Sequence, residues 1–252
     1  MTMTKSSQFT TPFVAATSIA AIEMLGHALQ HLQPLHVDEF LALLLISAVA
    51  SRLKLKLPGM DSNMSVNLPF LLLAVIRLSL FEALLVAMVS TAVQSVPKPG
   101  ELWQPVKVLF NVNTMALAAG VGAMLFHSEF LVTPAQSFGA LPLVLTGCAF
   151  FLVNTLSVAI IIALTENRNL FKNWGSICRL SFPYYLECTG LTSIIQTVSR
   201  HVGWQVPLAV LPVMVASYAC YKLYFGQATQ TLNTVSVNLS KPSPKHMTAG
   251  AS

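Results

Sequence analysis

Charged residues are scarce in this sequence: Asp, Glu, Lys and Arg make up only 9% of its 252 residues, whereas apolar residues make up 54%. Soluble globular domains carry about 25% charged residues. Long apolar stretches run from about Pro12 to Phe225 with only short polar breaks. Helices that are apolar on all sides are typical of contact with lipid. The composition therefore excludes an ordinary soluble domain and predicts an integral membrane protein.

The motifs of soluble catalysis are also missing. There is no phosphate-binding Gly-x-x-x-x-Gly-Lys-Ser/Thr loop, no Gly-x-Gly-x-x-Gly turn and no Gly-x-Ser-x-Gly elbow. Cysteines are few and show no Cys-x-x-Cys spacing, which argues against a zinc site or a disulfide framework. We expect them to be reduced and buried; they are Cys148, Cys178, Cys188 and Cys220. We predict no enzyme activity, no catalytic residue and no cofactor.

The apolar stretches predict an all-α bundle of about eight membrane spans, because about 20 apolar residues cross the bilayer as a helix. The stretch after residues 1–11 is too long for a signal peptide and lacks an Ala-x-Ala cleavage site, so we interpret it as a retained span. Residues 12–226 form the predicted bundle, and the polar segment 227–252 is predicted to be a disordered tail. The predicted spans are 12–32, 38–53, 65–79, 80–96, 106–126, 137–164, 180–199 and 204–225.

The unbroken apolar stretch from Val66 to Val96 is long enough for one very long helix or two short ones. Ser79 is followed three residues later by Glu82. This spacing is a capping box, in which the two side chains bind the free amide groups that open a helix. We therefore predict a new helix from Leu80 and a tight hairpin before it.

Basic residues indicate the orientation, because Lys and Arg concentrate in short cytoplasmic loops. With eight spans and both termini in the cytoplasm, the inner side holds Lys5, Arg52, Lys54, Lys56, Lys98, Lys107, Arg168, Lys172, Arg179, Lys222, Lys241 and Lys245. Only Arg200 falls clearly on the outer side. The predicted location is the cell inner membrane. The formal charge of +5 carries no basic patch with interleaved aromatic residues, so we predict contact with lipid and none with nucleic acid.

The first span carries three ionisable residues, Glu23, His27 and His31, spaced four apart on one helix face. An ionisable group in the membrane costs about 2.5 to 3.5 kcal/mol on insertion scales. Two histidines at this spacing near a carboxylate can hold a metal, ligate a cofactor or relay protons. The alternative is a polar stripe that faces the interior of the bundle and hydrogen-bonds to other helices. Both interpretations require that the stripe faces protein or a water-filled cavity.

Arg77 and Glu187 are the other ionisable residues at membrane depth. A pair between them would remove two isolated charges from lipid, although Arg77 can instead reach the outer interface. The candidate polar site consists of the three residues of the first span together with Arg77, Glu187, Asn111 and Asn113.

Amides and small residues predict how the helices pack. We expect Asn111, Asn113 and Asn154 to hydrogen-bond between helices. Small residues recur at four-residue spacing from Ala116 to Ala123, which is typical of a close helix-packing face.

An ordered set of segments resembles the multi-span membrane module that precedes HD-GYP phosphodiesterase or GGDEF cyclase domains in bacterial cyclic-di-GMP signalling proteins. The segments are Arg52 to Gly59, Met64 to Phe70, Leu78 to Ala83, Val108 to Val112, Met115 to Ala118, Asn154 with Thr155, Leu164 to Glu166, Ser181 to Leu186, Gly203 with Trp204, Leu211 to Val213 and Tyr221 to Tyr224. In such proteins the last span continues into a cytoplasmic enzyme domain. Residues after Phe225 carry no His-Asp or Gly-Gly-Asp-Glu-Phe motif, so the resemblance implies an input module without its output domain.

The resemblance implies a non-enzymatic, sensor-like or scaffold module that acts through a separate signalling or membrane protein. A small-solute transporter, or the substrate-binding subunit of one, remains an alternative; it requires a central cavity lined by Glu23, His27, Asn111, Asn113 or Glu187. An accessory subunit that packs on a larger complex through its Ala/Gly face is a third.

The first prediction concerns topology. A reporter that is active only in the cytoplasm should be active when fused after Gly226 and inactive when fused after Ser128, because the basic loops place these two sites on opposite sides. A reporter that is inactive at Gly226 excludes the eight-span arrangement.

Overall fold

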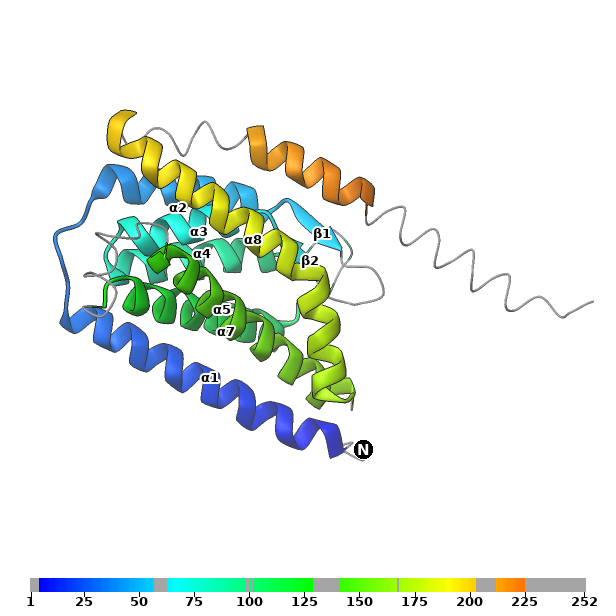
Figure 1. The fold of residues 1–252 in the computed structure, drawn as a ribbon. Helices are drawn as coiled ribbons and strands as arrows, with labels where there is room; N and C mark the ends of the chain where they lie inside the picture. Colours follow the sequence, from blue (N-terminus) through cyan, green and yellow to red (C-terminus); the bar gives the residue numbers. More distant parts are fainter. Residues whose placement is uncertain are drawn as a thin grey trace, which may run out of the picture.

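The computed structural model describes residues 5–56, 63–97, 100, 102–128, 141–166, 168–202 and 212–224. These residues form a bundle of helices with one small hairpin (Figure 1). The elements are α1 (Lys5–Gln30), α2 (Val37–Ser51), β1 (Lys54–Lys56), β2 (Asn63–Ser65), α3 (Leu68–Arg77), α4 (Leu80–Ser95), α5 (Pro105–Phe126), α7 (Leu141–Glu166), α8 (Leu170–Val202) and a helix at residues 212–224.

The prediction of a helical bundle is confirmed. Among the described residues, three helices are long and apolar enough to cross a membrane: Thr10–Gln30 of α1, α5 and α7. The shorter apolar helices are α3 and α4. The predicted spans at 137–164 and 204–225 extend partly over residues outside the described ranges.

Two helices extend beyond the predicted spans. α1 begins at Lys5 and continues through Pro12, although the apolar pattern starts only there. α8 begins at Leu170, ten residues before the predicted span. Apolar length marks the lipid-crossing part of a helix, and polar turns can extend it.

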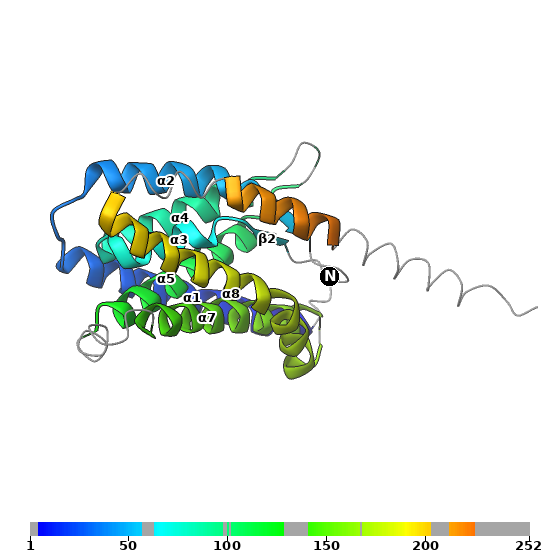
Figure 2. The ribbon, with the colours of Figure 1, turned by 45° about the horizontal axis from the view of Figure 1, so that its top comes forward.

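The short helix α3 lies at the centre of the bundle. It has 10 residues, and nine of them, Leu68 to Ile76, are buried. At a rise of about 1.5 Å per residue it is about 15 Å long, roughly half the hydrocarbon thickness of a bilayer. It packs against α2, α4, α5 and α8, and Figure 2 shows it between α4 and α8. A helix with no free face fits a sequence segment that is apolar on all sides.

The chain reaches α3 through the β1–β2 hairpin, which was not predicted. The two strands pair antiparallel, with Leu55 opposite Met64. The amide of Val66 then donates to the carbonyl oxygen of Leu53 at 3.3 Å. Extended backbone beside a membrane bundle is tolerated when its polar groups are paired within the protein. The hairpin provides such pairing on the approach to α3.

The predicted break between α3 and α4 is confirmed. Ser79 is the N-cap of α4, and Glu82 completes the capping box. The Glu82 carboxylate accepts hydrogen bonds from the backbone amide and the hydroxyl of Ser79, at 3.0 and 2.7 Å. It also accepts one from the amide of His36, at 3.0 Å. One fully buried side chain thus ties the start of α4 to the start of α2.

The predicted close-packing face of α5 is also confirmed. Ala118 and Ala119 are completely buried. A Cβ atom on Gly120 would lie only 2.7 Å from Cγ of Met24 in α1, and one on Gly122 would lie 3.4 Å from Thr146 in α7. The small residues therefore allow α5 to approach α1 and α7 closely.

The expectation that the cysteines are buried holds in part. Cys188 is buried and Cys178 is partly buried, but Cys148 and Cys220 are exposed. Both exposed cysteines lie on outward faces of their helices, where a small apolar side chain is compatible with lipid.

The second prediction tests the cap of α4. Replacing Ser79 by Ala should lower the free energy of unfolding by about 0.5 to 2 kcal/mol, because the amide of Glu82 loses its side-chain acceptor. Thermal or denaturant unfolding in a mild detergent would measure the loss. Ser176→Ala is the matched control, since Ser176 is exposed and bonds only within its own helix. Equal stability of the two variants would show that the cap contributes nothing.

Candidate functional site

The polar stripe of α1 points away from the bundle. Glu23, His27 and His31 are all exposed, whereas Ala21 and Ala28 on the opposite face are buried. The rings of His27 and His31 contact each other, with centroids 4.7 Å apart. The interpretation in which this stripe faces the interior of the bundle is therefore wrong. That it faces protein or a water-filled cavity and not lipid stays a prediction. The four-residue spacing showed that the three side chains share a face but carried no information about its direction.

Arg77 does not pair with Glu187, which was one of the two alternatives for Arg77. Arg77 Nε pairs with the carboxylate of Glu39, and each side chain is 17% exposed. Arg77 ends α3 and Glu39 lies in the first turn of α2, so both charges lie at the same end of the bundle. The capping carboxylate of Glu82 lies at this end as well. These groups connect the ends of α2, α3 and α4.

Glu187 instead binds the helix at residues 212–224. The Ser217 hydroxyl donates to Glu187 Oε1 at 2.6 Å, which is short enough for a hydrogen bond to a charged acceptor. Close by, the rings of Tyr184 and Tyr221 meet edge to face, with centroids 6.0 Å apart. Met214 is 1% exposed. We name these five residues the α8 seam; they hold the 212–224 helix against α8.

The α8 seam continues to the central helix. Tyr184 also hydrogen-bonds to the backbone of Leu68, at the start of α3. About two turns further along α8, the Thr192 hydroxyl donates to the carbonyl oxygens of Cys188 and Pro69, at 2.8 and 3.5 Å. The side chains of α8 thus touch α3 on one side and the 212–224 helix on the other.

Two of the predicted interhelical amides are confirmed. Asn113 Nδ2 donates to Ser18 Oγ at 2.7 Å and joins α5 to α1. Asn154 Nδ2 donates to the Tyr185 hydroxyl at 2.7 Å and joins α7 to α8. Asn111 is half-buried, nearly two turns from the N-terminal end of α5.

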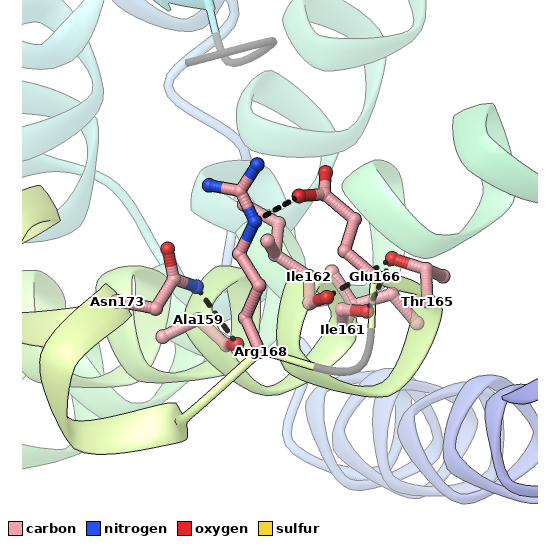
Figure 3. Close-up of polar contacts among 7 residues, drawn as sticks. All are labelled: Ala159, Ile161, Ile162, Thr165, Glu166, Arg168 and Asn173. Atoms are coloured by element: carbon pink, nitrogen blue, oxygen red, sulfur yellow. Dashed lines mark hydrogen bonds and ion pairs between the residues drawn. The ribbon is translucent and has the colours of Figure 1, made fainter. Parts of the chain in front are cut away.

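The turn between α7 and α8 holds polar contacts that were not predicted (Figure 3). Arg168 Nε lies 2.7 Å from the Glu166 carboxylate. Asn173 Nδ2 donates to the carbonyl oxygen of Ala159 at 3.3 Å, and the amide of Lys172 donates to Asn169 Oδ1 at 3.2 Å. Asn169 directly precedes α8 and accepts from an amide of its first turn, as an N-cap residue does. An Asn before an apolar helix is a signal that sequence inspection can find.

The seven candidate residues do not form one site. Glu23 and His27 lie on the outer face of α1, Arg77 lies at one end of the bundle, Asn113 lies between α1 and α5, and Glu187 lies in the α8 seam. Within the described ranges, no group of three or more His, Cys, Asp and Glu residues is placed to hold a metal ion. What the geometry does build is a connected path from α3 through α8 to the 212–224 helix.

Residues 24–224 match the MASE9 family, which is more than half of the chain. The chain belongs to the MASE9 family. MASE domains are membrane-associated sensor domains of signalling proteins. No curated protein and no solved structure is significantly similar to the chain. Family membership and three helices that are long and apolar enough to cross a membrane together indicate a membrane-associated module of the sensor type.

The third prediction tests the α8 seam of this MASE9 chain. Ser217→Ala removes a hydrogen bond to a charged group, which contributes about 1.5 to 3 kcal/mol. The amides of residues 212–224 should therefore exchange with solvent about tenfold faster or more, because the helix opens more readily. Hydrogen exchange with mass spectrometry in detergent would detect this change.

Thr197→Ala is the control for that experiment. Thr197 is exposed on α8 and bonds only to the carbonyl oxygen of Ser193. Its replacement should leave exchange in the 212–224 helix unchanged. If Ser217→Ala and the unchanged chain exchange at the same rate, the α8 seam does not attach this helix.

Proposed function

We propose that this chain is the input module of a bacterial cyclic-di-GMP signalling system. It is a non-enzymatic, multi-pass protein of the inner membrane that passes a signal to an HD-GYP or GGDEF domain carried by a partner. The observation that carries the proposal is membership of a sensor family over residues 24–224, combined with the ordered set of segments that resembles the membrane module of such proteins.

The proposed topology is eight passes through the membrane with both termini in the cytoplasm. The N-terminal end of α1, the β1–β2 hairpin and the C-terminal end of the 212–224 helix lie at one end of the bundle, and the α3–α4 turn lies at the other (Figures 1 and 2). In this arrangement α3 crosses only half of the bilayer as helix, and the extended segment before it completes the pass. Arg52, at the first of these ends, agrees with a cytoplasmic side.

Transmission runs through the α8 seam in our proposal. A change in the packing of α3 reaches Tyr184 directly, and Tyr184 contacts Tyr221 of the 212–224 helix. The Glu187–Ser217 hydrogen bond attaches the same helix to α8. Packed elements with discrete arrangements can convert a small shift at one site into a movement at another. The 212–224 helix is thus the element that presents the signal on the cytoplasmic side.

No observation specifically supports either alternative function. A solute pocket lined by Glu23, His27, Asn113 and Glu187 does not form, because these residues lie on separate faces. The small-residue face of α5 is covered by Met24 and Thr146 of the same chain, so it is not free to bind a larger complex.

The fourth prediction uses a chimera in which residues 1–224 precede a diguanylate cyclase domain of known activity. The chimera should be membrane-bound, and cellular cyclic-di-GMP should change at least twofold when Ser217 is replaced by Ala. The reason is that a loosened 212–224 helix no longer presents the cyclase domain in one arrangement. The same chimera with Thr197→Ala should match the unchanged one.

Cyclic-di-GMP levels that are identical in all three chimeras would refute transmission through the α8 seam. Synthesis or hydrolysis of cyclic-di-GMP by the purified chain alone would refute the non-enzymatic role.

A further inference from the structure

The first turns of α8 lie at one end of the bundle. α8 has 33 residues and is about 50 Å long, whereas the hydrocarbon region of a bilayer is about 30 Å thick. It contains Pro183, and a proline inside a helix removes a backbone hydrogen bond and kinks the helix. Figure 1 shows its first turns at the end of the bundle that holds the start of α1 and the β1–β2 hairpin, at an angle to the rest of α8. We call residues 170–182 the α8 start segment; it lies at the level of the lipid headgroups.

One side of the α8 start segment is buried against the bundle. Asn173, Ile177 and Ser181 follow one another at four-residue spacing, and all three are buried. Trp174 Nε1 donates to Thr155 Oγ1 of α7 at 3.3 Å. These contacts fix the rotation of the segment about its axis, so its opposite side is turned away from the bundle.

The outward side carries basic and aromatic side chains. Lys172 and Arg179 are exposed and lie about two turns apart, which places both on one stripe. Phe171 precedes Lys172 and is 78% exposed, and Phe182 follows one turn after Arg179 and is 51% exposed. In the part of the chain that the structure describes, neither basic residue forms an ion pair. The surface therefore combines two unbalanced positive charges with large apolar groups.

We propose that this outward side binds the headgroup of an anionic phospholipid of the inner leaflet. Lys172 and Arg179 attract the negatively charged headgroup, as basic residues at the cytoplasmic surface of a membrane do. The guanidinium of Arg179 can hold the phosphate with two hydrogen bonds. Phe171 and Phe182 contact the upper part of the acyl chains, since a helix at the interface combines basic residues with Phe in this way.

A lipid fits this side better than a soluble anion does. The occupant needs a negative group next to an apolar part, because the basic and aromatic side chains lie within about one turn of each other. A phospholipid offers both at the depth of the α8 start segment. A free phosphate would leave Phe171 and Phe182 in contact with water, which is unfavourable. The inference goes beyond the proposed signalling function and rests on the proposed topology only for the choice of leaflet.

The test uses the full chain in vesicles of phosphatidylglycerol and phosphatidylcholine in equal parts and with the same acyl chains. A photoreactive phenylalanine analogue replaces Phe182, light links it to the molecule beside it, and mass spectrometry identifies the adduct. Adducts of phosphatidylglycerol should exceed those of phosphatidylcholine by about fivefold or more, which is the effect of one basic residue near a membrane surface. Both leaflets of the vesicle have the same composition, so this result is independent of the topology and of signalling.

Charge variants show whether the basic stripe causes the preference. Lys172→Gln and Arg179→Gln should each lower the excess of phosphatidylglycerol adducts, and the two together should abolish it. Lys172→Arg with Arg179→Lys should keep it, because both charges remain. The fold should tolerate these changes, since Lys172 is exposed and the Arg179 side chain bonds only to the carbonyl oxygen of Gly175 in its own helix.

Lys107→Gln is the matched control for Lys172→Gln. Lys107 is also an exposed basic residue in the first turn of a helix, but of α5. Its replacement should leave the adduct ratio unchanged. The proposal is overturned by an adduct ratio that equals the vesicle composition in the unchanged chain, or by one that Lys172→Gln with Arg179→Gln does not alter. It is also overturned if Lys107→Gln lowers the ratio as much as Lys172→Gln does, or if the adducts are to polypeptide and not to lipid.

Discussion

Backbone hydrogen bonding inside the membrane is the constraint on which this bundle depends. A helix of 10 residues that begins inside the bundle leaves its first amide groups buried, and unpaired groups inside a membrane cost several kcal/mol each. The start of α3 is hydrogen-bonded by neighbouring elements. At its start, the amides of Phe70 and Leu71 donate to the carbonyl oxygen of Asn67. Tyr184 of α8 hydrogen-bonds to the backbone of Leu68, and the hairpin brings a paired backbone to this point. The surrounding helices are therefore needed for hydrogen bonding as well as for packing.

The C-terminal end of the same helix is held by charged groups. Arg77 pairs with Glu39, and Glu82 accepts hydrogen bonds from Ser79 and from the amide of His36. A buried carboxylate with several donors is stable, whereas one left without them would be strongly unfavourable. Both ends of α3 are consequently attached to other helices, which makes it a suitable element for sensing a change in packing. In the proposed function, α8 carries that change to the 212–224 helix.

Signals within a few neighbouring residues predicted much of the fold. Contacts between segments that are distant in the sequence could not be predicted from such signals. The capping box at Ser79 and the small-residue face of α5 are contained in a few neighbouring residues, so their outcome was confirmed. The alternation of Leu and Lys from residue 53 to residue 56 was a strand signal that the membrane interpretation concealed. The partner of Arg77 depended on how α2 and α3 pack, and no spacing within one helix reveals that.

The α1 stripe shows why direction is harder to predict than periodicity. A helix that lies at the side of a membrane bundle can turn polar residues inward, to bond with its own chain, or outward, to bond with another. The side of α1 that faces the bundle is already hydrogen-bonded and packed. Asn113 donates to Ser18 on that side, and Ala21 and Ala28 are buried there. Polar residues on the opposite side would only lower the stability of the protein in the membrane if lipid alone surrounded it. Their exposure therefore requires water, a lipid headgroup or another polar partner beside this face of α1.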